Sequence, residues 1–116
     1  MLQETLHVPV GLIISSWGGT MAQAWTSAET LKKDFSEIDL NAVTKETINQ
    51  NSTTVLYNGM IHPLIPFGIK GVIWYQGEGN RKQPGQYAKL FPALIANWRA
   101  DFKQADMPFY FVQIAP

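Results

Sequence analysis

Three short apolar runs, separated by stretches with helical spacing, constrain the fold of this chain more than any other feature. The runs occupy residues 8–15, 69–75 and 109–114, and they are rich in branched and aromatic side chains. Runs of this length and composition are typical of buried strands. Because strands that alternate with amphipathic helices form parallel sheets, we expect an α/β fold with helices on both faces of the sheet.

The segment between the first two runs predicts helices and a polar excursion. A short helical stretch should reach Trp25. Thr26 and Glu29 then have the spacing of a capping box, which predicts a helix over about residues 27–35. Residues 36–54 show no clean period, so we expect them to lie exposed to solvent.

Two further helices are predicted around the second run. Apolar residues at helical spacing within 55–66 fit a short helix that faces the core, and Pro63 and Pro66 make its end irregular. Residues 86–98 carry the strongest helical pattern of the chain. Pro92 lies inside this pattern and removes one backbone donor, so the helix either kinks there or begins its second part there.

Composition narrows the classes of partner. The chain has 116 residues, of which 46% are hydrophobic, so we expect one domain over residues 1–116. The net charge of zero argues against a nucleic acid or an anionic membrane as partner and favours a neutral or weakly charged substrate. The absence of cysteine excludes disulfides and thiolate chemistry. No apolar stretch approaches the ~18 residues of a membrane span.

Two polar loops follow the first two apolar runs. Residues 16–20 contain two glycines, and residues 76–80 carry Gln76, Glu78 and Asn80. In an open α/β sheet, loops at the carboxyl ends of parallel strands meet at one edge, where ligands bind. Amides such as those of Gln76 and Asn80 stabilise a developing oxyanion. Each loop is also compatible with a plain turn, in which glycines bend the chain and amides cap the backbone.

The chain has few candidates for a catalytic nucleophile or base. No serine lies in a Gly-x-Ser-x-Gly elbow, and the only histidines are His7 and His62. His7 precedes the first run, at the end of the sheet opposite the loops. His62 lies in an apolar stretch, where a packing role is more common than a catalytic one. No two histidines have metal-ligand spacing, so no metal site is expected.

Aromatic side chains flank both loops. Trp17 and Trp74 stand beside them, whereas Trp25 and Trp98 have the spacing of core residues. Trp17 and Trp74 are suited either to stacking on a sugar ring or to wedging the loops in place. Glu78 is a candidate acid or base, or an organiser of its own loop.

Five separated segments, taken together and in order, resemble the sialate O-acetylesterases of the SGNH hydrolase superfamily. They are Leu12-Ile13-Ile14-Ser15-Ser16-Trp17-Gly18-Gly19-Thr20 with Ala24-Trp25, then Leu56-Tyr57-Asn58-Gly59-Met60-Ile61-His62-Pro63-Leu64, then Gly71-Val72-Ile73-Trp74-Tyr75-Gln76-Gly77-Glu78-Gly79-Asn80, then Asn97-Trp98-Arg99, and finally Pro108-Phe109-Tyr110-Phe111-Val112-Gln113. The resemblance extends from about residue 8 to residue 116. One departure is Gly79, where the family usually has Ser.

The resemblance implies a flavodoxin-like, three-layer α/β/α fold that is incomplete at both ends of this chain. It also implies hydrolysis of O-acetyl esters on sialic acid or a related sugar, without a cofactor and in an extracytoplasmic setting. The family's nucleophile lies in a Gly-Gln-Ser-Asn motif and its base in an Asp-x-x-His segment, and neither is present here. The chain therefore resembles the central section of such an enzyme, which depends on the remainder of the same polypeptide.

Several residues match the family's oxyanion and binding loops. Gly19 matches the glycine whose backbone N–H joins the oxyanion hole. Gln76 is the expected side-chain donor, with Asn80 as the second choice. The candidate substrate-binding residues are Trp17, Trp74, Glu78 and His62. Two other interpretations stay open, namely a non-catalytic carbohydrate-binding module and a structural α/β domain.

Overall fold

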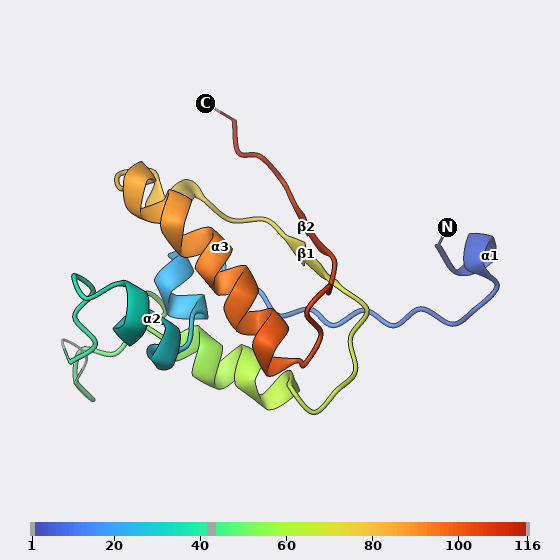
Figure 1. Ribbon diagram of the computed structural model, residues 1–116, viewed down its shortest axis with the longest axis horizontal. Helices are drawn as coiled ribbons and strands as arrows, with labels where there is room; N and C mark the ends of the chain where they lie inside the picture. Colours follow the sequence, from blue (N-terminus) through green and yellow to red (C-terminus); the bar gives the residue numbers. More distant parts are fainter. Residues whose placement is uncertain (1, 42–43, 116) are drawn as a thin grey trace.

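A parallel pair of strands packed against one long helix forms the centre of the molecule (Figure 1). The computed structural model describes residues 2–41 and 44–115. The strands are β1 (Val72–Trp74) and β2 (Phe109–Phe111), and helix α3 (Pro84–Asp101) lies between them in the chain. The register pairs Val72 with Phe109, Ile73 with Tyr110 and Trp74 with Phe111. The predicted α/β class and parallel pairing are confirmed, although both strands are shorter than the apolar runs that contain them.

Short helices occur in the three predicted stretches that end at Trp25 or lie within residues 27–35 and 55–66, and also at residues 2–6 and 78–80, where none was predicted. The other elements are α1 (Leu2–Leu6), η1 (Ala22–Trp25), α2 (Ala28–Asp34), η2 (Tyr57–Ile61), η3 (His62–Leu64) and η4 (Glu78–Asn80). Elements η2 and η3 are turns of π-helix and 3₁₀-helix, and Pro63 in η3 explains this irregular end. Helix α3 runs through Pro92, so the proline does not end it. The described part of residues 36–54 consists of turns and bends and is mostly exposed, as expected.

The first turn of α2 is capped one residue later than predicted. Ser27 is the N-cap, and its Oγ accepts a hydrogen bond from the backbone N–H of Thr30 at 3.3 Å. Thr26 is fully buried, and its hydroxyl donates to the carbonyl oxygen of Ala22 at 3.0 Å. The predicted pairing of Thr26 with Glu29 is wrong because the Thr26 hydroxyl already has this partner in η1.

The hydrophobic core is built around Trp74, the last residue of β1, which is 7% exposed. Its ring packs edge-on against Trp25 and Trp98, with centroid distances of 6.3 and 5.6 Å, and stacks on Phe91 at 5.9 Å. The fully buried side chains around it include Leu31, Leu90 and Leu94. Trp25 and Trp98 are therefore core residues, as predicted. This packing fixes β1 against α3 and sets where the loop after β1 emerges.

The opposite face of the sheet is uncovered. Ile73 and its register partner Tyr110 are 81% and 70% exposed, because alternate strand residues point away from α3. Tyr75 and Val112 extend this exposed row beyond the strand ends. Residues 2–41 and 44–115 therefore cover one face of the sheet only, and the expected helices on the second face are not among them.

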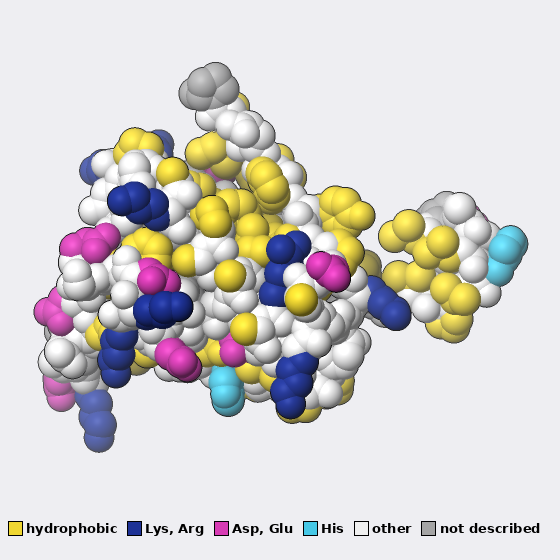
Figure 2. Space-filling model, in the orientation of Figure 1, with side chains coloured by type: hydrophobic (Ala, Val, Ile, Leu, Met, Phe, Trp, Pro, Cys, Tyr) yellow, Lys and Arg dark blue, Asp and Glu magenta, His cyan; other side chains and the backbone are white. Residues whose placement is uncertain are grey.

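Residues 8–15 do not form the predicted first strand. They make an extended, mostly exposed arm that links α1 to the body of the molecule, and Leu12 and Ile14 on it are highly exposed (Figure 1). The Ser15 Oγ fixes the end of the arm by donating to the carbonyl oxygen of Met60 at 3.1 Å. An apolar run becomes a strand only when a neighbouring backbone pairs with it, and the described sheet consists of β1 and β2 alone. Figure 2 shows hydrophobic side chains gathered on the arm and around the strands.

A hydrogen-bond network around Asn97 and Asp101 at the end of α3 joins three helices. The hydroxyl of Tyr57 on η2 and the side-chain amide of Asn97 on α3 both donate to Oδ2 of Asp101, each at 2.6 Å. Asn97 Oδ1 in turn accepts from the backbone N–H of Ser27, the N-cap of α2, at 2.8 Å. Burial and the hydrogen bond to Asp101 raise the pKa of Tyr57 above its ordinary value. Tyr57 therefore stays protonated at pH values where an exposed tyrosine ionises.

Replacing Tyr57 by Phe should remove part of the pH dependence of stability in alkali. Because the folded-state pKa is raised, the protonated hydroxyl stabilises the native chain below about pH 10, and this stabilisation declines as the pH rises toward the folded-state pKa. We expect the parent to exceed Tyr57→Phe in free energy of unfolding by about 1–2 kcal/mol near neutral pH, and by less at about pH 11. Urea denaturation followed by tryptophan fluorescence measures both values. Tyr110→Phe, at an exposed tyrosine, is the control, and a gap that is the same at both pH values contradicts the prediction.

Candidate active site

The two polar loops lie against each other at the carboxyl end of β1. Gln76 Nε2 donates to the backbone carbonyl oxygen of Thr20 at 3.0 Å. Across the same contact, the backbone N–H of Ala22 donates to Oδ1 of Asn80 at 2.9 Å. These two bonds confirm the prediction that the loops meet.

Asn80 lies at the centre of this contact. Its side chain is 4% exposed and makes three hydrogen bonds. Besides the Ala22 N–H, Oδ1 accepts from Gln76 Nε2 at 2.7 Å, while Nδ2 donates to Oε1 of Gln23 at 3.0 Å. Because two of these partners belong to η1, the Asn80 carboxamide holds the loop at residues 76–80 against that helix.

A glycine allows the loops to come this close. A Cβ atom at Gly79 would lie 2.8 Å from the carbonyl oxygen of Thr20, a distance that side-chain carbons do not reach in folded proteins. The obstacle is backbone, so a larger residue at this position has to push the two loops apart. Gly79 is therefore a point of close contact between the loops.

The turn that carries Gly19 is fixed to the core through Thr20. The Thr20 hydroxyl donates to the carbonyl oxygen of Trp17 at 2.7 Å and accepts from Nε1 of the buried Trp25 at 2.9 Å. Gly19 is exposed and has a φ of +74°, in the left-handed region that favours glycine. A backbone N–H that stabilises an oxyanion has to be held in place in this way before the reaction begins.

The Gln76 amide is held by two acceptors. Its Nε2 donates to Thr20 and Asn80, whereas its Oε1 is buried and has no hydrogen-bond partner in the described part of the chain. Its backbone carbonyl oxygen accepts from the hydroxyl of Tyr87 at 3.1 Å, and burial raises the pKa of Tyr87. An amide nitrogen has two hydrogens, so an oxyanion receives one from Gln76 only if a present bond is exchanged.

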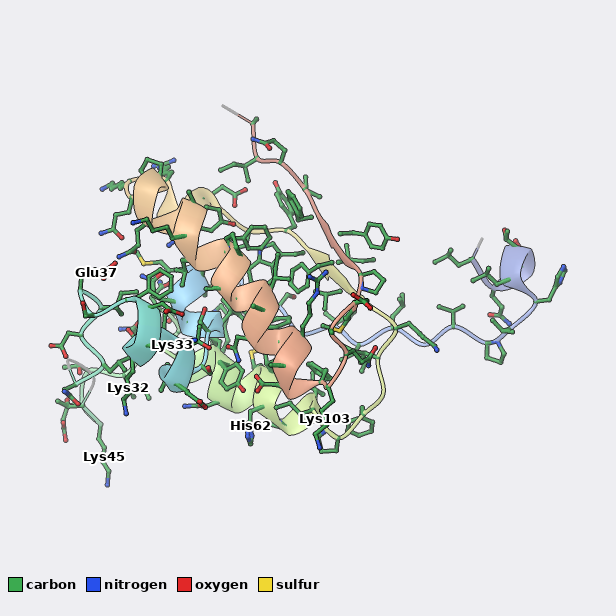
Figure 3. The ribbon with its side chains drawn as sticks, viewed as in Figure 1. Lys32, Lys33, Glu37, Lys45, His62 and Lys103 are labelled. Atoms are coloured by element: carbon green, nitrogen blue, oxygen red, sulfur yellow. The ribbon has the colours of Figure 1, made fainter. Side chains whose placement is uncertain are left out.

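The candidate substrate-binding residues fall into two groups. Trp17, which is 53% exposed, and Glu78, which is also exposed, belong to the joined loops. Trp74 lies in the core below them. His62 is exposed on η3, where its ring meets Tyr57 edge-on at 6.1 Å, and Figure 3 shows it pointing outward at the edge of the molecule. The structure therefore places Trp17 and Glu78 in the joined loops that carry the amides, but not Trp74 or His62.

A surface depression of about 680 Å³ lies along the second half of α3 and the turn after it. Pro92, Ile95, Arg99 and Lys103 are among its lining residues, and none of the predicted site residues lines it. Within residues 2–41 and 44–115, His, Asp and Glu side chains form no group suited to hold a metal ion. No helix in the same ranges has both the length and the apolar character needed to cross a bilayer.

Sequence reasoning missed three residues that hold the loops in place. Thr20 fixes the first loop, Tyr87 contacts the second, and Gln23 bonds to Asn80. Thr20 belongs to the predicted first loop, where no role was assigned to it, whereas Gln23 and Tyr87 belong to no motif with known chemistry. For Gln23, the available signal was a single polar side chain between Ala22 and Ala24 in a helical stretch whose other residues are buried.

The parallel strands and the long helix define an α/β domain, and the two polar loops meet at the carboxyl end of β1, where enzymes of this class bind their ligands. A family model described as "Carbohydrate esterase, sialic acid-specific acetylesterase" matches residues 1–116. The chain belongs to this family, and its named relatives are carboxylic ester hydrolases. The resemblance noted in the sequence is confirmed.

The relatives extend well beyond the matched region. The sialate O-acetylesterases of Homo sapiens and Pongo abelii are 40% and 39% identical to the chain and match 98% of it. The chain spans 23% of the length of each. The crystal structure of a carbohydrate acetylesterase from Xanthomonas citri is similar, with a TM-score of 0.78 and 41% identity over 97% of this chain and 23% of that one.

Proposed function

We propose that this chain carries the oxyanion and substrate-binding loops of an esterase that removes O-acetyl groups from sialic acid or a related sugar. The observation that carries this proposal is the hydrogen bond from Gln76 to the Thr20 carbonyl oxygen, because it joins the two loops into one polar site. Membership of the family supports the proposal, and a net charge of zero suits a weakly charged substrate.

Gly19 and Gln76 are the proposed oxyanion donors, with Asn80 as the second side-chain candidate. When the ester is attacked, the carbonyl carbon becomes tetrahedral and its oxygen gains negative charge. The backbone N–H of Gly19 donates to that oxygen, and Gln76 exchanges its bond to Thr20 for one to the oxyanion. Loss of one such donor typically lowers turnover ~10²–10³-fold. Trp17, beside these donors, is the proposed stacking surface for the sugar.

The nucleophile and the base are proposed to come from the remainder of the same polypeptide. Ser16 lies in the first loop, whereas His62 lies on η3 and points outward at the edge of the molecule. The uncovered sheet face around Ile73 and Tyr110 suits a three-layer α/β/α domain, in which further elements cover that face. The chain spans about a quarter of the length of the matched relatives, so the rest of a protein of that length is long enough to supply such elements.

An acetylated sugar should stabilise the chain by binding to its native state. At a ligand concentration about ten times Kd, the unfolding midpoint should rise by on the order of 5 °C. The measurement is differential scanning calorimetry with 9-O-acetylated N-acetylneuraminic acid, and the unacetylated sugar should give a smaller shift. Trp17→Ala should abolish the shift, whereas Tyr110→Ala, an exposed aromatic on the far face of the sheet, should retain it. Equal shifts in the two variants contradict the proposed site.

The second candidate function is a non-catalytic carbohydrate-binding module, which is favoured by the exposed indole of Trp17. A measurement of ester hydrolysis distinguishes it from the esterase. The chain by itself should not release acetate from the sugar above the buffer rate. Turnover that Ser16→Ala and His62→Ala abolish would mean a self-contained triad and would overturn the proposed roles. If the proposal holds, a longer polypeptide that includes this chain should hydrolyse the ester. If the chain is instead part of a non-catalytic carbohydrate-binding module, the longer polypeptide should bind the sugar without hydrolysing it.

A further inference from the structure

We propose that Gln23 is a positioning residue that fixes the carboxamide of Asn80 and, through it, the amide of Gln76. The inference rests on the proposed function only for what the Gln76 amide does to a substrate. Gln23 lies on η1, is half-buried, and matches none of the residues carried over from the family's loops.

The orientation of the Asn80 carboxamide is set from two sides. The backbone N–H of Ala22 requires an acceptor, and Oδ1 supplies it at 2.9 Å. Oε1 of Gln23 requires a donor, and Nδ2 supplies it at 3.0 Å. A flipped Asn80 carboxamide would place its NH₂ group against the Ala22 N–H and its Oδ1 against Oε1 of Gln23. Both contacts would be repulsive in a site where Asn80 has almost no access to water.

The fixed carboxamide in turn sets the direction of Gln76. Asn80 Oδ1 and the carbonyl oxygen of Thr20 both accept from Gln76 Nε2, at 2.7 and 3.0 Å. The Gln76 Oε1 atom is left buried without a partner, which opposes this orientation. The orientation persists because the reverse one would bring Oε1 against two acceptor oxygens. Gln23 therefore acts at the start of a relay of side-chain amides that ends on the proposed oxyanion donor.

Gln23 is itself held by contacts outside the loops. Its backbone carbonyl oxygen accepts from the N–H of Thr54 at 3.0 Å, and its Nε2 lies 3.1 Å from the sulfur of Met21 as a donor. These contacts leave Oε1 as the atom that faces Asn80. The relay is thus supported by the end of the polar excursion, a segment distant from the loops in sequence.

The test uses the side-chain NH₂ signals of Asn80 and Gln76 in ¹⁵N-labelled chain. Gln23→Met keeps the length of the side chain and removes the acceptor, so hydrogen exchange of both NH₂ groups with water should accelerate about tenfold, as expected when a hydrogen bond of ordinary strength is lost. Gln23→Glu keeps an acceptor in the same place, so both NH₂ groups should stay protected and the Asn80 protons should shift downfield. Gln86→Met, the same change at a half-buried glutamine that bonds to Glu37 rather than to the loops, should leave all these signals at their parental values.

The NH₂ signals are measured without a substrate, so the outcome of this test is independent of whether the chain binds the sugar. A failure of the Gln23 proposal can therefore be told apart from a failure of the proposed function. Parental exchange rates in Gln23→Met would overturn the proposal, because a glutamine that only fills space is replaced by methionine without loss. Equal acceleration in Gln23→Glu and Gln23→Met would overturn it as well. If Gln23→Met does not fold, Gln23→Glu decides the question, since unchanged Asn80 protons beside a new carboxylate would show that the two side chains are not bonded.

Discussion

Replacing Trp74 by Ala should remove a large share of the free energy of unfolding of the chain. The indole contacts Trp25, Trp98 and Phe91, so its removal opens a cavity where the sheet meets α3. Truncation of a buried tryptophan costs about 3–5 kcal/mol, and a small domain has only about 5–15 kcal/mol in total. Near-ultraviolet circular dichroism should lose its aromatic signal, and the urea midpoint should fall sharply or become undefined.

Trp17→Ala is the matched control for this result. It removes the same side chain from an exposed position, so it should change the free energy of unfolding by no more than about 0.5 kcal/mol. Trp74→Phe should fall between the two, because it keeps an aromatic ring against Phe91 and loses only part of the volume. A Trp74→Ala chain with the urea midpoint of the parent would show that the core does not depend on this ring.

Replacing Asn80 by Leu should destabilise the chain by about 3 kcal/mol, the upper part of the range for burying a polar group without its partner. Leucine has a similar size but no hydrogen-bonding atoms. The Ala22 N–H and Oε1 of Gln23 lose their partner, and Gln76 Nε2 loses one of its two acceptors. Urea denaturation measures the free energy, and the sugar-induced rise in melting temperature should vanish because the loops are no longer held together.

The same substitution at Asn58 separates this effect from a general response to leucine. Asn58 is exposed on η2, and its side-chain amide has a single long contact of 3.5 Å to the Thr54 hydroxyl. Asn58→Leu should therefore stay within about 0.5 kcal/mol of the parent. If both variants lose the same stability, the bonds of Asn80 do not hold the loops.

The fold was predictable where an element's own residues determine it. Helix α3 follows from a repeat of apolar residues that is complete within residues 86–98. A strand depends on a neighbour that the local sequence does not specify. Residues 8–15 have the composition of a strand and remain an exposed arm, and the runs around β1 and β2 pair over only part of their length.

The candidate site was predictable in outline. The expectation that the two loops meet is confirmed by the bond between Gln76 and Thr20, although only the loop at residues 76–80 follows a strand. The partners of each amide were not predictable, because Gln23 and Asn80 are far apart in the chain and their contact depends on how η1 packs. Likewise, the sequence left Trp74 as either a stacking surface or a wedge, and only the depth of its burial shows that it supports the loop from the core.

The one-sided sheet has a consequence for how such a domain comes together. All the aromatic rings in contact with Trp74 belong to residues 25–109. The core on this side of the sheet therefore packs without any element that would cover Ile73 and Tyr110 on the other side. During synthesis of a longer polypeptide it can form as an early intermediate. As long as the sheet face around Ile73 and Tyr110 stays uncovered, its exposed hydrophobic side chains are accessible to chaperones and to neighbouring nascent chains.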